Sequence, residues 1–581
     1  MTNDLESLHG APEILIVGAG PSGLVLALSL VRNGVPVRVI EKSTTNRIGQ
    51  RGSGLSPRSL EVFESLGVAE EIIKRAIDIP MFRMYKMPGG VDILKEFAPA
   101  PHLNPTPDRP YLCAYTASLS QLNFVLFGQD GLDEVLRAEL AKFGCTVELG
   151  AELQSLDQAD HENVRVKILH HSLDETSSSS LSVEESTYRW VIGADGARGV
   201  VRKQVGMTFV GKTTELTFIV GDITTKDPLP HRWNLWGDIT DVVYSLSDGS
   251  TVIRPTDTPG VWNFILGGSK LASTSEICAS EKTLKEYIKA KIGNRDDIQI
   301  TQFLWTSPYR INIRMVDTFK KGRVFVTGDA GHVHSPTGGQ GLNTGIQDSY
   351  NLGWKLALVT KGLAPLSLLD TFNGERYPVV SEMLNVTTDL MNKTLEHSNN
   401  EKGWDRSGDV NQLGINYRGS TIVVDEAEDT GKEPPQKGSS YTIEAGGYVH
   451  PGDRAPDAPG LFQISKGSQK SAAMRLFKLF NPTRHTVLVF ADRTDYKSVL
   501  ATLQKYNREL VRPMVITKIG EGADIVGENV FEDRDGHAGG AYKGPEGVSG
   551  LFVIRPDGMV GARIRSIEAL NRYFEGIFGH V

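Results

Sequence analysis

The chain has 581 residues, 39% of them hydrophobic and 23% charged, with a formal net charge of −8. This length and composition are typical of a globular protein of two to four domains. The acidic balance argues against nucleic acid as a main partner, because phosphate binding requires clustered lysine and arginine. The first ten residues are acidic and polar, so we expect no signal peptide, no membrane anchor and a cytoplasmic location. The three cysteines lie far apart, which fits a reducing compartment and no metal site.

The first predicted element is a buried parallel strand over residues 13–17, and a helix over residues 24–32 follows it. Between them lie Gly18, Gly20 and Gly23 in a G-x-G-x-x-G pattern. The first glycine permits a tight turn, the second lets a pyrophosphate approach the backbone, and the third allows close helix–strand packing. The positive end of the helix then faces the phosphates. This pattern predicts a dinucleotide site but does not distinguish FAD from NAD.

A second predicted strand, residues 37–40, ends at Glu41, whose carboxylate stands at the distance expected for a contact with the ribose hydroxyls. The loop 46–58 follows and carries arginine at both ends. From this position the loop could hold a phosphate or the edge of a flavin, or its arginines could be ordinary surface residues. The sequence does not choose between these two interpretations.

The next stretch, residues 77–127, contains many prolines and is interpreted as part of a substrate-facing layer. An amphipathic helix is predicted over residues 129–140. Short alternating runs between residues 210 and 317 predict an antiparallel sheet inserted into the nucleotide domain, with one helix over residues 281–291. The serine-rich stretch 177–180 is interpreted as a solvated hairpin tip.

Two further motifs each follow a predicted strand. Residues 188–192 lead into Asp195-Gly196, and residues 322–327 lead into Gly328-Asp329. The second motif continues through a glycine-rich loop into a helix over residues 346–358, whose start would expose backbone N–H groups. A histidine pair, His332 and His334, has no third ligand nearby in the sequence, so structural roles are favoured over a metal site.

A long helix is predicted from residue 368 to about 393, and a polar stretch to about residue 437 is interpreted as a linker. Strands over residues 486–491 and 550–555 and a last helix over residues 567–577 then predict a separate α/β domain.

These motifs together carry a resemblance to a known family. The amino-terminal glycines, Asp195-Gly196 and Gly328-Asp329 resemble the three signatures of the single-component flavoprotein aromatic hydroxylases, in the same order, over residues 12 to 395. From about residue 440 the chain is similar to the thioredoxin-like carboxyl-terminal domain of the phenol hydroxylase branch. The implied fold class is α/β and α+β. A Rossmann-like FAD-binding domain would carry an inserted antiparallel-sheet substrate domain, and a thioredoxin-like α/β domain would follow.

The resemblance also implies domain boundaries. The FAD-binding domain would comprise residues 12–76, 126–209 and 318–395, and the substrate domain residues 77–125 and 210–317. A linker over residues 396–440 would lead to a thioredoxin-like domain over residues 441–581. That last domain has no cysteine, so it could not perform dithiol chemistry.

The resemblance assigns residues to FAD one by one. Gly18, Gly20 and Gly23 would take the pyrophosphate, Glu41 the adenosine ribose and Asp329 the ribityl chain. Arg51, Gln129 and Asp195 match further cofactor-contacting positions of the family, and Asp195 lies in a motif linked to both FAD and NAD(P)H. The segment against the isoalloxazine ring would contribute Pro336, Gly338, Gly339, Gly341, Leu342 and Asn343.

Three positions depart from the family pattern. Gly199 replaces the usual serine of the Asp195 motif. An aspartate that helps to activate phenol in phenol hydroxylase is Ser53 here, and a catalytic tyrosine of that enzyme falls on Phe264. Arg254 matches the arginine partner of that tyrosine and is the one candidate catalytic residue. The substrate could therefore already be acidic, such as a polyphenol or an aromatic acid.

The implied reaction is hydroxylation of a phenolic or other electron-rich aromatic substrate. NADPH or NADH would reduce FAD, and O₂ would form a flavin hydroperoxide that transfers one oxygen atom. Two alternatives stay open, because function depends on the substrate layer. The first is epoxidation, decarboxylative hydroxylation or Baeyer–Villiger insertion on a secondary metabolite. The second is a catalytically silent flavin-binding protein. A homodimer is expected from the family alone.

Overall fold

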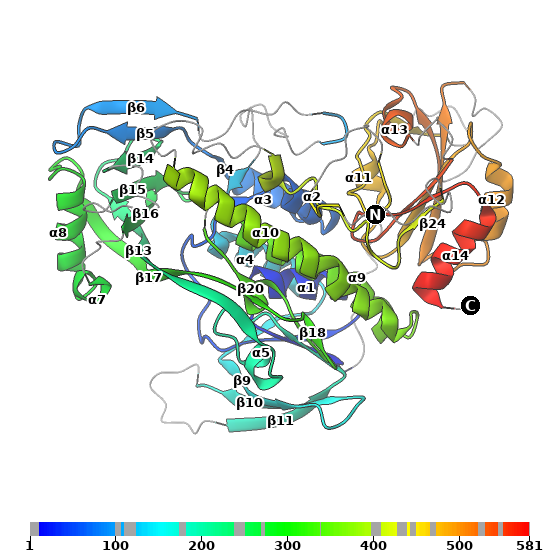
Figure 1. The fold of residues 1–581 in the computed structure, drawn as a ribbon, viewed down its shortest axis with the longest axis horizontal. Helices are drawn as coiled ribbons and strands as arrows, with labels where there is room; N and C mark the ends of the chain where they lie inside the picture. Colours follow the sequence, from blue (N-terminus) through cyan, green and yellow to red (C-terminus); the bar gives the residue numbers. More distant parts are fainter. Residues whose placement is uncertain are drawn as a thin grey trace.

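The computed structural model describes residues 11–98, 106–109, 124–172, 182–237, 250–268, 273–336, 338–396, 408–426, 438–441, 449–464, 472–520, 529–543 and 550–579. Figure 1 shows an eight-stranded sheet at one end of the molecule and the carboxyl-terminal sheet at the other, with a parallel sheet and its helices between them.

The central sheet has six strands in the order β18-β19-β12-β1-β2-β8. All neighbours pair in parallel except β18 and β19, which are antiparallel. The strands are short apolar runs because helices cover the sheet. Their bounds are Lys320–Lys321, Val324–Val326, Trp190–Gly193, Ile14–Val17, Val37–Glu41 and Val147–Leu149. The strands and the helix predicted for the dinucleotide motif are thereby confirmed.

Helix α1 (Pro21–Arg32) begins with proline at its first turn and is buried along almost its whole length. It packs against α4 (Gln129–Ala141) and α9 (Gln340–Thr360). Shorter elements complete this region and include the three-stranded sheet β3-β7-β4. They are α2 (Pro57–Ser65), α3 (Ala69–Arg75), α5 (Val200–Gln204), β3 (Gly54–Leu55), β4 (Ile77–Asp78), β7 (Val125–Leu126) and the 3₁₀ helices η2 (Gly328–Ala330) and η3 (Leu366–Leu369).

A second antiparallel sheet, β11-β10-β9, lies against the edge of the central sheet at the bottom of Figure 1. Its strands are β9 (Ala151–Asp157), β10 (Val164–His170) and β11 (Ser182–Tyr188). The expected serine-rich hairpin tip at residues 177–180 lies outside the described residues.

The eight-stranded sheet follows the order β20-β17-β13-β16-β15-β14-β5-β6. All its neighbours pair in antiparallel fashion except β14 and β5. The strands are β20 (His332–Val333), β17 (Ile300–Val316), β13 (Phe209–Thr225), β16 (Val261–Gly268), β15 (Ser250–Pro255), β14 (Trp233–Trp236), β5 (Phe82–Tyr85) and β6 (Ile93–Phe97). The expected antiparallel sheet is confirmed, whereas residues 238–249 of the stretch predicted to form it lie outside the described residues.

The two faces of this sheet have different roles. On the outer face, Ile219, Ile253 and Phe264 form one apolar cluster with helix α8 (Glu281–Lys291) and the short helix α7 (Thr274–Ile277). Because side chains alternate along a strand, the neighbouring residues Phe218 and Ile265 lie on the inner face. The apolar clusters of this face are separate from the outer cluster. This inner face is turned toward the central sheet, as the contacts described below show.

The carboxyl-terminal sheet has the order β21-β27-β26-β23-β24-β25-β22. Strands β23 and β24 are parallel, and β26 is antiparallel to both β23 and β27. The strands are β21 (Val424–Asp425), β22 (Leu461–Gln463), β23 (His485–Phe490), β24 (Val511–Lys518), β25 (Val530–Asp533), β26 (Leu551–Ile554) and β27 (Val560–Ile564). The helices are α11 (Leu476–Leu479), α12 (Tyr496–Leu503), α13 (His537–Ala541) and α14 (Ile567–Phe578).

Residues 408–426 fall within the linker expected over residues 396–440. They include the 3₁₀ helix η5 (Gly408–Asn411), and strand β21 pairs with β27 of the carboxyl-terminal sheet. Gln412 is fully buried and exchanges side-chain hydrogen bonds with Gln340 and Gln347 of α9. These polar groups are therefore paired inside the protein.

Helix α10 (Asp370–Glu396) anchors the carboxyl-terminal domain through a buried ion cluster. The Glu375 carboxylate accepts hydrogen bonds from Lys355 at 2.7 Å and from both terminal nitrogens of Arg555 at 2.8 and 2.9 Å. All three side chains are fully buried, and Arg555 is also paired with Asp557. The stability of the central domain and that of the carboxyl-terminal domain are therefore coupled, because removing one partner would leave a buried charge unpaired.

No helix in the described ranges is long and apolar enough to cross a membrane.

The buried cluster predicts a large stability effect. Glu375→Gln should lower the free energy of unfolding by about 3–5 kcal/mol, because Lys355 and Arg555 lose a shared buried counter-charge. Asp370→Asn, which removes the partner of Lys320 at the surface, is the matched control and should cost less than about 1 kcal/mol. Urea unfolding of the three proteins measures both values, and equal effects in the two variants would contradict the role given to the cluster.

Candidate active site

Two glycines of the G-x-G-x-x-G loop are required by close packing, whereas the third faces open space. Gly18 has a φ of +105°, and a Cβ there would lie 2.3 Å from the Ala194 carbonyl oxygen. A Cβ on Gly23 would lie 2.1 Å from the carbonyl oxygen of Gly18. At Gly20 the nearest heavy atom to such a Cβ is a guanidinium nitrogen of Arg47, at 3.5 Å. Gly20 therefore faces free space under a positive charge, as a pyrophosphate site requires.

Sequence reasoning chose Arg51 as the cofactor contact and left the role of Arg47, at the start of the loop 46–58, open. Arg47 lies over the glycine loop, and its positive charge acts on Asp329 and on Asp133 of helix α4. Arg51 instead has a φ of +43°, and its guanidinium carbon lies 5.1 Å from the centre of the Trp305 ring. The available signal for Arg47 was its place at the start of the loop 46–58, beside the glycines.

Glu41 lies where the sequence predicted, at the end of β2. Its carboxylate accepts hydrogen bonds from the backbone nitrogens of Ala19 and Ser43, both at 3.1 Å. The carboxylate is thus fixed at the edge of the glycine loop. Gln129 begins α4, and its backbone nitrogen donates to the Gln50 carbonyl at 3.1 Å. Among the described residues its side-chain amide has no protein partner, so it is available to a ligand.

Asp195 has a capping role in the structure. One carboxylate oxygen accepts hydrogen bonds from the backbone nitrogens of Val200 and Val201 at 2.6 and 3.0 Å. The other oxygen is buried without a hydrogen-bond partner among the described residues, and burial raises the pKa of the group. A Cβ at Gly199 would lie 2.3 Å from this second oxygen, which gives a steric reason for the missing serine.

Asp329 follows β19, and its residue surface is accessible. Desolvation by the surrounding protein raises the pKa of its carboxyl group, with the nearby charges of His332 and Arg47 opposing this rise. The carboxyl group is thus accessible to a ligand at the edge of the central sheet. Arg202 connects the two aspartate motifs, because its guanidinium donates to the carbonyl oxygens of Ala330 and Ala197 at 2.6 and 2.7 Å.

The two histidines near Asp329 both make hydrogen bonds inside the protein. His332 shares a buried hydrogen bond of 2.7 Å with Asp348, which also accepts a bond of 2.7 Å from Arg376. His334 shares a bond between Nδ1 and the Ser335 carbonyl, and burial lowers its pKa to about 4. Both rings therefore hold the loop that leads to α9.

This loop ends at the start of α9. Gly339 has a φ of +64° and caps the helix, and a Cβ there would meet no atom within 4 Å. The space in front of the helix start is therefore open, and the first N–H groups of the helix favour negative charge there. The Asn343 side chain, by contrast, is fully occupied. It donates to the Gly54 and Gly339 carbonyls at 2.9 and 2.8 Å and accepts from Ser56 and Ser59.

Arg254 lies on the inner face of the eight-stranded sheet and is almost fully buried. It donates to the Ser53 hydroxyl at 2.9 Å, and burial lowers its pKa to about 10. Next to it in the cross-strand row, Asp222 accepts hydrogen bonds from Asn263 at 2.8 Å and from the backbone nitrogen of Gln50 at 2.8 Å. This row, Arg254, Asn263 and Asp222, is termed the polar row and joins the sheet to the loop 50–53.

Phe264 lies on the opposite face. It packs in the outer cluster and makes an edge contact with Phe303 at 5.9 Å between ring centres. Because residues 263 and 265 point inward, residue 264 must point away from the inner face. Phe264 therefore has no contact with the site, and any substrate-facing hydroxyl must come from another residue.

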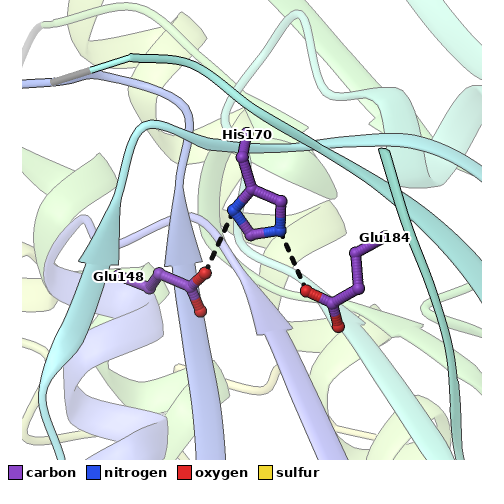
Figure 2. Close-up of side chains that lie close together, drawn as sticks. All are labelled: Glu148, His170 and Glu184. Carbon is purple, nitrogen blue, oxygen red and sulfur yellow. Dashed lines mark hydrogen bonds and ion pairs between the residues drawn. The ribbon is translucent and has the colours of Figure 1, made fainter. Parts of the chain in front are cut away.

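One group of potential metal ligands lies elsewhere. Figure 2 shows the His170 ring between the carboxylates of Glu148 and Glu184, with one ring nitrogen turned toward each, at 3.3 and 2.9 Å. Arg38 of β2 also pairs with both carboxylates, at 2.8 and 2.5 Å. One guanidinium thus already pairs with both carboxylates, together with the His170 ring. We interpret the group as a polar contact between the central sheet and the sheet β11-β10-β9.

Comparison with known proteins identifies the family. Residues 12–387 match the model of the family described as "FAD binding domain". A flavin-dependent monooxygenase of Mycobacteroides abscessus is 34% identical over 479 residues, which cover 82% of this chain and 88% of that protein. Pentachlorophenol 4-monooxygenase of Sphingobium chlorophenolicum is 27% identical and covers 95% of this chain and 93% of its own length.

A solved structure shares the fold. The ternary complex of aklavinone-11 hydroxylase with FAD and aklavinone has a TM-score of 0.74 and 21% identity, over 98% of this chain and all of that chain. The protein belongs to the FAD binding domain family and has its mixed α/β fold. Within that family it is a flavin-dependent aromatic monooxygenase. The open space at Gly20, the accessible Asp329 and the uncovered start of α9 fit FAD.

The glycine geometry predicts two different failures. Gly20→Ala should leave the stability of the FAD-free protein nearly unchanged, because no protein atom lies within 3.5 Å, yet weaken FAD binding by roughly tenfold or more. Gly23→Ala should destabilise the FAD-free protein itself. FAD titration and thermal unfolding distinguish the two outcomes, and full FAD affinity in the Gly20 variant would show that the pyrophosphate lies elsewhere.

Asp133 of α4 predicts a pH dependence. It is buried with neither carboxylate oxygen bonded among the described residues, and burial raises its pKa to about 7. A raised pKa means that the bound proton stabilises the fold fully below about pH 4, and that this stabilisation disappears as the pH rises through 7.

Asp133→Asn keeps a neutral group at every pH. The FAD-free variant should therefore gain stability relative to the wild type between pH 5 and pH 8, by about 2 kcal/mol. Urea unfolding at both pH values measures this gain. Glu134→Gln, at the exposed next residue of the same helix, is the control. A stability difference that does not change with pH would rule out the buried acid.

Proposed function

We propose that the protein uses NADPH or NADH to hydroxylate a phenolic aromatic compound. The observation that carries the proposal is that the inner face of the eight-stranded sheet is held against the loop 50–53, beside the cofactor motifs. Asp329 lies at the edge of the central sheet, and its charge contributes to the raised pKa of Tyr309 on β17. When bound, FAD would supply electron transfer from the reduced nicotinamide and the activation of O₂.

The residues of the chain divide the supporting tasks. Arg47 and the backbone at Gly20 would bind the pyrophosphate, Glu41 the adenosine ribose and Asp329 the ribityl hydroxyls. Gly18 and Gly23 keep the loop in place. The start of α9, at residues 340–342, would stabilise negative charge on the ring system, and residues 336–343 would lie against it. Arg51, Gln129 and Asp195 are proposed as further contacts at the rim of the FAD site.

The polar row would shape the substrate end of the site. Arg254 holds Ser53, and Asp222 holds the backbone of Gln50, so the loop 50–53 is closed over the sheet. A closed loop excludes water from the reacting atoms, which limits wasteful loss of the activated oxygen as H₂O₂. Arg254 therefore acts through Ser53 and is a positioning residue in this proposal.

The substrate class is supported by the lining and by the relatives. Phe218, Val220 and Ile265 give the inner face an apolar surface suited to an aromatic ring. The related proteins are named for pentachlorophenol and aklavinone, which supports phenols from single rings to polycyclic compounds as candidates.

The carboxyl-terminal domain is proposed to be thioredoxin-like, as in the phenol hydroxylase branch. Helix α12 connects the parallel pair β23 and β24, and an antiparallel hairpin, β26 and β27, precedes the last helix α14. This arrangement supports the assignment. Without cysteine, its role would be structural. The domain boundaries given above, a cytoplasmic location and a homodimer remain proposals of the same kind.

The function is tested by oxidation of NADPH and NADH with a panel of phenols, aromatic acids and polycyclic phenols. One class should stimulate oxidation and give a product one oxygen atom heavier, with little H₂O₂. Arg254→Met should retain FAD but shift the outcome toward H₂O₂, because the loop 50–53 is released. A protein that binds FAD but responds to no aromatic compound would contradict the proposal.

A further inference from the structure

Tyr309 lies on the inner face of the eight-stranded sheet. It pairs in register with Phe218 of β13, and their ring centres are 6.3 Å apart. Phe218 belongs to an inner cluster with Ile311, and the neighbouring inner residues Val220 and Ile265 pack against that cluster. The Tyr309 ring therefore adds to the same apolar lining as the residues that face the central sheet.

The Tyr309 hydroxyl has no hydrogen-bond partner in the part of the chain that the structure describes. Some tyrosine hydroxyls of the core are paired: Tyr350 donates to the Pro556 carbonyl, Tyr85 to Asn234 and Tyr542 to the Pro456 carbonyl. Others, on Tyr441 and Tyr573, are buried without a partner among the described residues. The Tyr309 residue differs from all of these because 38% of its surface is accessible, so its unpaired hydroxyl can bond to a ligand.

Tyr309 is accessible on this inner face, with 38% of its residue surface exposed. The face is held against the central domain by the bonds from Arg254 to Ser53 and from Gln50 to Asp222. Partial burial and the charge of Asp329 raise the pKa of Tyr309 to about 12, so its hydroxyl stays neutral and lies within the influence of the cofactor motif.

We propose that Tyr309 is a substrate-positioning residue whose hydroxyl donates a hydrogen bond to an oxygen atom of the bound aromatic compound. The proposal rests on the proposed function and deepens it. The neutral Tyr309 hydroxyl is the donor in this bond. The group that it contacts on the substrate is therefore an acceptor, either a phenol oxygen or a ring carbonyl. Tyr309 then supplies the substrate-facing hydroxyl that Phe264 cannot supply from the outer face.

The geometry also limits the substrate. The polar row lies four residues further along β13 than Phe218, which corresponds to roughly 13 Å at about 3.3 Å per residue. A compound that contacts both Tyr309 and the Ser53–Arg254 pair must therefore span more than one ring. Single-ring phenols could use the Tyr309 end alone, whereas a polycyclic compound with oxygens at both ends could use both contacts.

The test measures binding of two probes to the FAD-loaded protein. The probes are 1-naphthol and naphthalene, which differ by one oxygen atom, and binding is followed by the change in flavin absorbance. In Tyr309→Phe the dissociation constant of 1-naphthol should rise about fivefold, the effect of one neutral hydrogen bond, while that of naphthalene should not change. Bound FAD and the melting temperature should match those of the wild type.

Tyr287→Phe is the matched control. Tyr287 lies on α8, where it packs on the outer face of the same sheet. This variant should bind both probes as the wild type does. An equal loss for both probes in Tyr309→Phe would show a packing role, and no loss for either would remove Tyr309 from the site; both results overturn the inference and leave the proposed function intact. A wild-type protein that binds neither probe would contradict the substrate class as well.

Discussion

The site depends on the close contact between the glycine loop and the end of β12. The Ala194 backbone nitrogen donates to the Val17 carbonyl at 2.8 Å, and the Ala194 carbonyl oxygen occupies the place that any side chain at Gly18 would need. The Gly18 nitrogen in turn donates to the Ile40 carbonyl at 2.8 Å. These contacts bring the carboxyl ends of β1, β2, β12 and β19 to one edge. In parallel sheets this edge is where ligands bind, and here it gathers Glu41, Asp195 and Asp329.

A second constraint positions the substrate layer against that edge. The polar row crosses β15, β16 and β13 and binds the loop 50–53, which belongs to the central domain. Buried polar groups hold two surfaces in one register because each loses its partner if the surfaces slide. The apolar inner face beyond the row can then remain accessible to a ligand without loss of alignment.

The carboxyl-terminal domain is fixed to the back of this assembly by the same kind of interaction. Glu375 on α10 binds Arg555, and Tyr350 and Trp354 on α9 donate to Pro556 and Asp557. Because α9 begins at the proposed ring site, the same helix contacts both that site and the carboxyl-terminal domain.

Local sequence patterns predicted most of the fold and the positions of some residues of the site. The strand–glycine–helix unit, Glu41 and Asp329 were predictable because each depends on a short apolar run that ends at the sheet edge. Arg47, Asp133 and Tyr309 were not, because their roles follow from tertiary contacts with no periodic signal. Phe264 faces the outer cluster because strand alternation, which depends on an exact register, decides the face. The polar stretch around Gln412 is buried because its amides pair with those of α9, which composition alone does not reveal.

A crystal structure of the FAD-loaded protein tests the central claim most directly. The account predicts the pyrophosphate over Gly20 beside Arg47, and the flavin ring between residues 336–343 and the inner face that carries Tyr309. A pyrophosphate away from Gly20, or a flavin ring that does not lie between Asp329 and Tyr309, would contradict it.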